Sequence, residues 1–300
     1  MKSTAFFPAS VLAVALMAIG VDAAAQQPVS IPVQPLNPAL RAKLPKDIVT
    51  AGEMTAVNSG SFPPYEIIGD KTYIGASADF SDALGQMLGI KIKHETVSGL
   101  SGLLIGIKSG RYQFAMGPVG DFPARQANSD FVDYVQEFVV FAVANGNPQA
   151  INKLADTCGK RVAVMAGGSA EKVIQQQALE CTKGGKPEVQ VQSYADQPTA
   201  VLSVRSKRAD AFFSSQAPLT YFVHQANGQL ELSGQGTKNG FEDLYQGAVV
   251  PKGSPLAEIL RTGMQKLVDN GTYAIIMKKW GLQNNMLKAP GVNLAKDTAK

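Results

Sequence analysis

The chain has 300 residues, of which 45% are hydrophobic and 17% are charged, and its formal net charge is +4 at pH 7. This composition supplies enough apolar side chains for a packed core and excludes a wholly disordered chain. The charge is mild and no basic cluster is interleaved with aromatic residues, so nucleic acid is not expected as a partner.

Residues 1–25 have the pattern of a secretory signal peptide. Lys2 gives a positive start, residues 5–20 form an apolar run, and Ala23–Ala25 provides an A-x-A cleavage site. The alternative is a membrane anchor, but the run is short for a membrane span and contains Pro8. No cysteine lies near the cleavage site, so a lipid anchor is not indicated. We therefore expect a signal cut after Ala25 and a periplasmic protein.

The segment that follows the signal, residues 26–46, is rich in proline, with five prolines between Pro28 and Pro45. Because proline fixes φ and has no N–H to donate, this pattern predicts an extended leader that lies outside the core.

Beyond the leader, strand-like and helix-like segments alternate. The first round predicts the strands EMTAV, IKIKHETV, YQFAMG and FVVFAVA, at 53–57, 90–97, 112–117 and 138–144. Two helices lie between the first three strands. One carries Phe80, Leu84 and Leu88 at helical spacing. It ends at Gly89, and the other helix spans 101–110.

A second round begins after a turn at 145–148. Its predicted strands are KRVAVMAGG, EVQVQSY and ADAFFSS, at 160–168, 188–194 and 209–215. The helices between them span 169–185, with Ser169 as the N-cap, and 198–208. A strand at 246–251 and helices over 254–281 close the chain. The repeated alternation predicts an α/β fold with largely parallel sheets.

The chain contains two cysteines, Cys158 and Cys181. An even number in an exported protein favours a disulfide, which stabilises by about 3 kcal/mol in the chain-entropy model. The alternative is a pair of buried free thiols. The only histidines, His94 and His224, lie far apart in the sequence and neither cysteine belongs to a CxxC motif. We therefore expect no metal site, and no cofactor is indicated.

The order of several short motifs resembles that of one family of transport proteins. These motifs are FPPYE, YIGASADFSDALGQMLGIKIK, GLLIGIKSGRYQFAMG, PARQANSDFVDY, CGKRVAVMAGGSAEK, VRSKRADAFF and LVDNGTYAIIMKKWGL. Together they resemble the periplasmic solute-binding proteins of polar amino-acid ABC importers, that is, the extracellular solute-binding proteins of family 3. The resemblance covers about residues 42–288. Its most specific parts are the closing DNGTYAIIMKKWG and the CGKRVAV…C pair.

This resemblance implies the type II periplasmic binding fold, in which two doubly wound α/β lobes are joined by two crossing strands. The implied boundaries are lobe 1 at 47–143 plus 247–288, lobe 2 at 144–246 and a tail at 289–300. The crossings are expected near 143–147 and 244–248. A solute binds in the cleft between the lobes, which close on it by a hinge motion. The implied partners are a small carboxylate-bearing solute, an amino acid or its analogue, and the membrane permease of an ABC importer. The protein itself is expected to be a monomer.

The resemblance also implies which residues hold the solute. Arg125 occupies the position of an arginine that grips the solute carboxylate with its planar fork of donors. Ser169 occupies the position of a hydroxyl at a helix start, where N–H groups favour an anion. Phe62 and Leu100 occupy the positions of the cleft walls. The other implied site residues are Gly120, Gly168 and Ser215.

Each of these positions also has a simpler interpretation. Arg125 can form a surface ion pair with Asp130 or Asp133. Ser169 can act only as a helix cap, and the two wall residues can belong to ordinary core packing.

The sequence departs from the family pattern at several expected solute contacts. Hydroxyl side chains are usual in the turn before the arginine, but this chain has Gly117, Pro118 and Gly120 there. An aspartate usually pairs with the α-ammonium group, but this chain has Ser215, which cannot replace the charge. Asp121 is a candidate substitute, although an acid is common there without contacting the solute. We therefore hypothesise that the carboxylate clamp is kept and the usual ammonium clamp is lost. The solute is then a carboxylate other than a standard α-amino acid, or an amino acid held differently.

Two other functions fit parts of the sequence. Ser169 and Lys172 form an S-x-x-K motif that resembles the serine and lysine of penicillin-recognising enzymes. The companion motifs of a serine hydrolase are missing, so we expect a protein that is not an enzyme. The lost hydroxyls also suit a binding fold that serves as a sensor or accessory partner without the usual amino-acid ligand.

Overall fold

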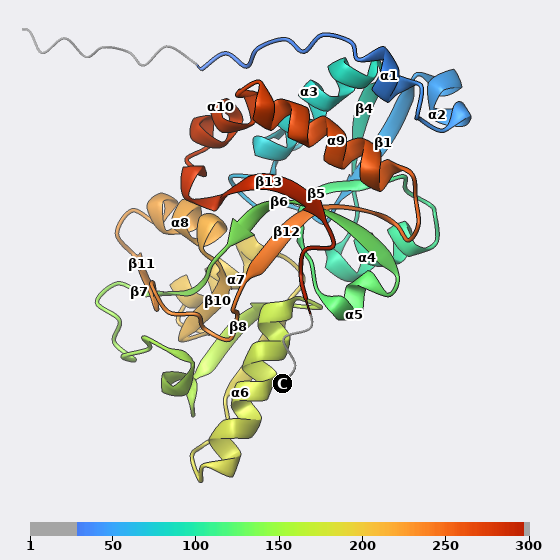
Figure 1. Ribbon diagram of the computed structural model, residues 1–300. Coiled ribbons are helices and arrows are strands. Elements are labelled where there is room, and N and C mark those ends of the chain that lie inside the picture. Colours follow the sequence, from blue (N-terminus) through green and yellow to red (C-terminus); the bar gives the residue numbers. More distant parts are fainter. Residues whose placement is uncertain (1–28, 297–300) are drawn as a thin grey trace, which may run out of the picture. The chain divides into compact units, whose positions relative to one another are not determined.

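The computed structural model describes residues 29–296 of the chain (Figure 1). The predicted signal peptide, residues 1–25, and the first residues of the predicted leader lie outside this range. All the described helices and strands belong to the unit formed by Ile31–Lys300. Within the described range, no helix is long and apolar enough to span a membrane.

A first group of elements combines the N-terminal and C-terminal parts of this unit (Figure 1). Its antiparallel sheet has the order β13-β6-β12-β5, and its other strands pair as β1 with β4, in parallel, and β2 with β3. The strands are β1 (Glu53–Asn58), β2 (Ile67–Ile68), β3 (Tyr73–Ile74), β4 (Lys91–Thr96), β5 (Ala115–Gly120), β6 (Ser129–Glu137), β12 (Leu244–Pro251) and β13 (Met286–Val292). The helices are α1 (Pro38–Arg41), α2 (Lys46–Ala51), α3 (Ala76–Leu88), α4 (Gly99–Lys108), α5 (Pro123–Gln126), α9 (Leu256–Asp269) and α10 (Thr272–Lys279), with a 3₁₀ turn at Gln283–Asn285.

A second group consists of the middle of the chain. Its mixed sheet has the order β11-β7-β10-β8-β9, in which β8 pairs in parallel with β9 and β10. In contrast, β7 pairs antiparallel with β10 and β11. The strands are β7 (Val139–Ala144), β8 (Arg161–Met165), β9 (Gln190–Tyr194), β10 (Ala211–Ser215) and β11 (Leu230–Ser233). The helices are α6 (Ser169–Lys183), α7 (Gln197–Arg205) and α8 (Gln216–Gln225), with a 3₁₀ turn at Leu154–Thr157.

The predicted α/β class is confirmed, but the sheets are less parallel than expected. Parallel pairing is found for β1 with β4 and around β8, where helices connect the strands. The long strands β6 and β12 pair antiparallel, and an antiparallel pair needs no crossover helix. β5 spans Ala115–Gly120 rather than 112–117. Gly117, Pro118 and Gly120 therefore lie in a strand and not in the predicted turn.

The chain passes between the two groups twice. The first passage is at Phe138, between β6 and β7, and not at the predicted 143–147. The apolar residues of β7 pair with β10 and β11, and an apolar strand has the same sequence pattern whichever sheet it joins. The second passage lies between Ser233 and Leu244, just before the predicted 244–248.

The predicted extended leader is wrong for the described residues before Asp47. Leu40 and Leu44 are 3% and 5% exposed and belong to the core of the first group. Pro38 begins helix α1, whose cap Asn37 accepts a hydrogen bond from the Leu40 N–H at 2.9 Å. Proline suits a first helical turn because the N–H that it lacks has no helical partner there. The prediction was based on the proline content of the segment and did not take the spacing of Leu40, Leu44 and Ile48 into account.

The described residues of the predicted tail, 289–296, are also part of the fold. β13 pairs with β6, and the residues after it reach two buried aspartates. The Leu294 N–H donates to Asp133 Oδ2, and the Ala295 N–H donates to Asp121 Oδ2, both at 2.9 Å. These two carboxyl groups therefore anchor the C-terminal segment to the first group.

The buried Asp133 makes stability depend on pH. Burial, together with the neighbouring Asp121, raises the pKa of Asp133 to about 8. An unfolded aspartate releases its proton near a pKa of about 3.9, so the folded chain holds more protons between these two values. The unfolding free energy therefore falls as the pH rises through this window. We expect Asp133→Asn to make this fall shallower by about 1.4 kcal/mol per pH unit between pH 5 and 7.

Denaturant unfolding at several pH values measures this slope. Asp269→Asn is the matched control, because Asp269 lies at the exposed end of α9. A slope in Asp133→Asn equal to that of the wild-type protein contradicts the prediction.

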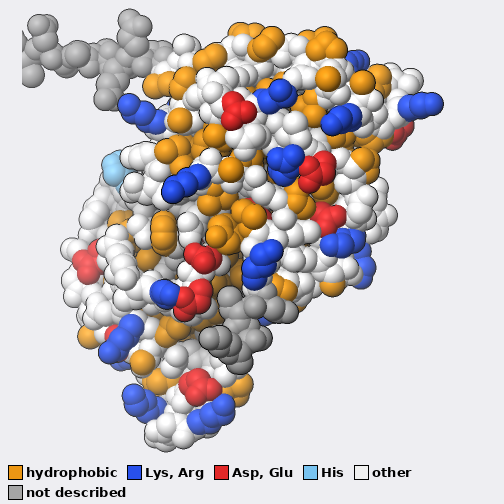
Figure 2. Space-filling model, viewed as in Figure 1, with side chains coloured by type: hydrophobic (Ala, Val, Ile, Leu, Met, Phe, Trp, Pro, Cys, Tyr) orange, Lys and Arg blue, Asp and Glu red, His pale blue; other side chains and the backbone are white. Residues whose placement is uncertain are grey.

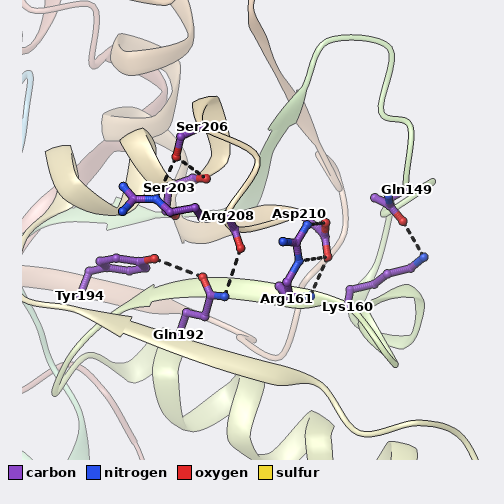
Figure 3. Close-up of polar contacts among 9 residues, drawn as sticks. All are labelled: Gln149, Lys160, Arg161, Gln192, Tyr194, Ser203, Ser206, Arg208 and Asp210. Carbon is purple, nitrogen blue, oxygen red and sulfur yellow. Dashed lines mark hydrogen bonds and ion pairs between the residues drawn. The ribbon is translucent and has the colours of Figure 1, made fainter.

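The predicted disulfide is confirmed. Cys158 and Cys181 are joined with an S–S distance of 1.96 Å, which ties the segment between the 3₁₀ turn and β8 to helix α6. On another side of the same sheet, the Arg161 guanidinium donates to Asp210 Oδ1 at 2.6 Å (Figure 3). The Arg161 N–H also donates to Asp210 Oδ2 at 2.8 Å. This pair fixes the start of β8 beside the residue that precedes β10.

Charged side chains of both signs are scattered over the face of the protein shown in Figure 2. Lysine and arginine side chains stand among aspartate and glutamate side chains, with hydrophobic side chains between them. This face presents no continuous patch of one charge.

Candidate ligand-binding site

One cavity is lined by residues of both groups. Its volume is about 80 Å³. All of the sequence-predicted site residues line it, namely Phe62, Leu100, Gly120, Arg125, Gly168, Ser169 and Ser215. The structure thus brings together residues that are up to 153 positions apart, from Phe62 to Ser215. That they contact a solute stays a prediction.

Arg125 lies on the short helix α5, directly after strand β5. Its Nη1 donates to the Gly120 carbonyl oxygen at 2.8 Å, and its Nη2 donates to the Gly167 carbonyl oxygen at 3.1 Å. The Phe122 ring lies under the guanidinium, with its centre 5.1 Å from the guanidinium carbon. The side chain is therefore positioned by the backbones of both groups and by an aromatic face.

The positive charge of Arg125 is not compensated by an ion pair within the described part of the chain. The alternative pairing with Asp130 is not formed, because Asp130 pairs with Lys252 at 2.8 Å. Burial lowers the pKa of Arg125 to about 10, against an opposing effect of Asp121. The guanidinium thus stays charged at neutral pH. Arg125 is half-buried, and a cation that is partly withdrawn from water without a counter-ion favours the binding of an anion.

Helix α6 begins at the cavity. Its N-cap is Gly168 and not the predicted Ser169, which is the first helical residue. No side chain caps this helix start, and the Glu171 carboxylate instead accepts from the Gly167 N–H at 2.8 Å. A helix start carries unpaired N–H groups and the positive end of the helix dipole. Gly168, Ser169 and Ala170 line the cavity. The positive end of the α6 dipole therefore adds to the positive charge of Arg125 there.

The walls of the cavity are mainly apolar. Phe62 and Leu100 both line it, as predicted. Leu100 is also part of the core of the first group, so its side chain both packs in the core and forms part of the cavity wall. Sequence reasoning missed most of the other apolar wall residues, which are Leu103, Val119, Val139, Met165 and Leu244.

Ser215 lies at the end of β10, where it faces a glutamine from β12. The Gln246 Nε2 donates to the Ser215 hydroxyl oxygen at 3.3 Å. Gln246 is 6% exposed, and its Oε1 has no hydrogen-bond partner among the described residues. Sequence reasoning missed Gln246, although the strand QGAVVP that contains it was identified. Only the tertiary structure shows that this strand passes the cavity.

The acid considered as a substitute for the missing aspartate lies elsewhere. Asp121 does not line the cavity, and its carboxylate accepts from Gln126 Nε2 at 2.8 Å and from the Ala295 N–H. The cavity is instead lined by Glu66. The signal for Glu66 was present in the sequence, because it ends the FPPYE motif that begins with Phe62.

The S-x-x-K pair lies at the start of α6. Ser169 and Lys172 both line a second cavity, of about 780 Å³, which Arg125 also lines. Residues 29–296 contain no cluster of three or more potential metal ligands.

Comparisons with known proteins agree on one family. The family described as bacterial extracellular solute-binding proteins, family 3, matches residues 54–283. The arginine-binding protein ArgT of Corynebacterium glutamicum is 26% identical and covers 85% of this chain and 83% of its own length. The L-cystine-binding protein TcyJ of Escherichia coli K12 is 24% identical, with coverages of 74% and 79%. A solved structure of an ancestral arginine-binding protein with bound arginine is 24% identical. It covers 76% of this chain and 98% of its own, with a TM-score of 0.69.

Proposed function

This chain belongs to the bacterial extracellular solute-binding proteins of family 3, and on that premise we propose that it captures a small carboxylate-bearing solute for an ABC-type importer. The solute is an amino acid or a close analogue. It binds in the cavity between the two groups of elements, with its carboxylate on Arg125. The relatives named for arginine and cystine support this class of solute.

The observation that carries the proposal is the uncompensated charge of Arg125 beside the start of α6. Two positive features face one small cavity, and no carboxylate of the described chain pairs with the guanidinium. A solute carboxylate supplies the missing charge. It accepts from the guanidinium fork and from the N–H groups of the helix start.

Capture is proposed to involve a hinge motion of the two groups. They are joined only by the short passages at Phe138 and before Leu244 among the described elements. The Arg125 to Gly167 hydrogen bond connects the two groups across the cavity, and it breaks if they separate. A solute carboxylate that binds both Arg125 and the start of α6 also connects the two groups, and it therefore favours the closed arrangement.

The remaining features of the proposal follow from the family. The protein acts in the periplasm after cleavage of its signal, works as a monomer and delivers its solute to a membrane permease. It performs no chemistry on the solute.

Mass spectrometry of small molecules that copurify with the protein tests the proposal directly. Thermal unfolding with L-arginine, L-cystine, the other L-amino acids and their 2-hydroxy analogues extends the test. A bound solute at 100 times its Kd stabilises the folded state by about 2.7 kcal/mol. If no small carboxylate copurifies or raises the melting temperature, the proposal is wrong. The protein is then a sensor or accessory partner.

A further inference from the structure

The cavity that contains Arg125 also contains a buried carboxyl group with unused bonding capacity. Glu66 is 4% exposed and lines the cavity. Its backbone is fixed by two hydrogen bonds with Phe62, at 2.8 and 2.9 Å. Its Oε1 accepts from the Tyr73 hydroxyl at 2.9 Å. Its Oε2 has no partner among the described residues, and no lysine or arginine of residues 29–296 pairs with it.

The chemistry of a buried carboxyl group such as Glu66 predicts the kind of partner that it binds. An isolated buried carboxylate is unfavourable, and burial raises the pKa of Glu66 to about 8, against the opposing hydrogen bond from Tyr73. The arginine in the same cavity does not relieve this, because it forms no ion pair with Glu66 in the described part of the chain. A cation that enters the cavity provides the missing partner.

A second acceptor in the cavity is also unused. Gln246 Oε1 is buried without a hydrogen-bond partner among the described residues, while the Nε2 of the same side chain is held by Ser215. Leaving such an oxygen unpaired costs about 1–3 kcal/mol, so a solute that donates to it gains affinity.

We propose, on the basis of the proposed function, that Glu66 is the acid that pairs with the cationic group of the solute, with Gln246 Oε1 as a further acceptor for its N–H groups. Glu66 thereby replaces the aspartate that the family usually has at Ser215. The cavity then has a positive end, at Arg125 and α6, and a negative end, at Glu66. It selects a solute that carries both a carboxylate and a cationic nitrogen.

The pairing predicts a proton exchange that accompanies binding. The groups around Glu66 are the Tyr73 hydroxyl, Tyr134 of β6, the His94 ring stacked on Tyr73, and Arg125 across the cavity. Burial raises the pKa of both tyrosines and lowers that of His94 to about 4, so these three groups do not titrate between pH 6 and 8. Glu66 is protonated below pH 8 in the free cavity and ionised when a cation is bound. Binding therefore releases about one proton, and affinity rises about tenfold per pH unit up to pH 8.

Calorimetry with matched probes tests the inference. The probes are L-arginine, L-citrulline, which lacks the guanidinium charge, and L-argininic acid, which has a hydroxyl in place of the α-amino group. L-Histidine, L-cystine and L-lactate complete the set. Glu66→Gln is expected to weaken the binding of the cationic probe at least 30-fold. It is expected to change the affinity for the analogue that lacks the cationic group by less than threefold. The arginine analogues identify which nitrogen Glu66 holds.

Glu95→Gln is the matched control. Glu95 also accepts a tyrosine hydrogen bond, from Tyr112 at 2.6 Å, but it does not line the cavity. Proton release by the wild-type protein, measured in buffers of different ionisation enthalpy, gives a readout that does not depend on how Glu66→Gln folds.

The outcomes separate the two proposals. If a probe binds through Arg125 without proton release, and Glu66→Gln binds it as the wild-type protein does, the role of Glu66 is wrong and solute capture stands. The same conclusion holds if L-lactate, which carries no cationic nitrogen, is the one probe that binds. If no probe binds and no small molecule copurifies, the proposed function itself fails.

Discussion

Arg125→Ala is expected to weaken solute binding by about 2–5 kcal/mol, or about 30- to 4,000-fold, because a buried carboxylate then loses its charged partner. Arg125 forms no ion pair within the described residues, so its charge is available to the solute. Arg125→Lys keeps the charge but replaces the planar fork with a single ammonium group. We expect it to retain part of the affinity, at about tenfold weaker binding.

Isothermal calorimetry with the copurifying solute measures both effects. Arg111→Ala is the control, because Arg111 is exposed and pairs with Glu95 only at 4.0 Å. Arg125→Ala also loses the bonds to Gly120 and Gly167, so its thermal unfolding without solute must be compared with that of Arg111→Ala. Equal affinity of Arg125→Ala and the wild-type protein rules out Arg125 as the carboxylate clamp.

Gly247→Ala is expected to destabilise the folded chain by about 3 kcal/mol or more. Gly247 lies in β12, in register with Asp133 of β6, at a point where the pairing is irregular. A Cβ added there lies 1.9 Å from the Val132 carbonyl oxygen and 2.6 Å from the Asp133 Cα. Both atoms belong to the backbone of the neighbouring strand, so no side-chain movement relieves the overlap.

Denaturant unfolding, or the yield of folded protein, measures this loss. Gly102→Ala is the matched control, because Gly102 lies within α4 and an added Cβ meets only Val97 Cγ2, at 3.9 Å. We expect it to be neutral or to stabilise by up to about 1 kcal/mol, since alanine favours a helix interior over glycine. A Gly247→Ala variant as stable as the wild-type protein contradicts the packing of β12 against β6.

Local patterns in the sequence determined the elements and part of the candidate site. Apolar spacing and Gly89 defined α3, and the alternating strands EMTAV and EVQVQSY gave β1 and β9. The even cysteine count predicted the disulfide. These features depend on neighbours in the chain or on composition, so the sequence expresses them directly. Arg125 and Ser169 were found through motif order, which records the fold of the family.

Only the tertiary structure decided which strands pair and which polar groups meet. The local sequence of an apolar strand such as Val139–Ala144 does not indicate which sheet the strand joins. For this reason the first passage, which lies at Phe138, was predicted at the wrong position. The buried Leu40 was hidden among prolines, because its partners lie far away in the sequence.

The lining of the cavity likewise depends on contacts between residues that are distant in the sequence. Glu66 and Gln246 are 180 residues apart, and nothing local to either indicates that both face the cavity of Arg125. Burial changes their chemistry as well, because the raised pKa of Glu66 and the unpaired oxygen of Gln246 exist only where the fold excludes water. The sequence therefore predicted Arg125, the residue that we propose for the solute carboxylate. Only the fold brought Glu66, the residue that we propose for the cationic group, into the same cavity.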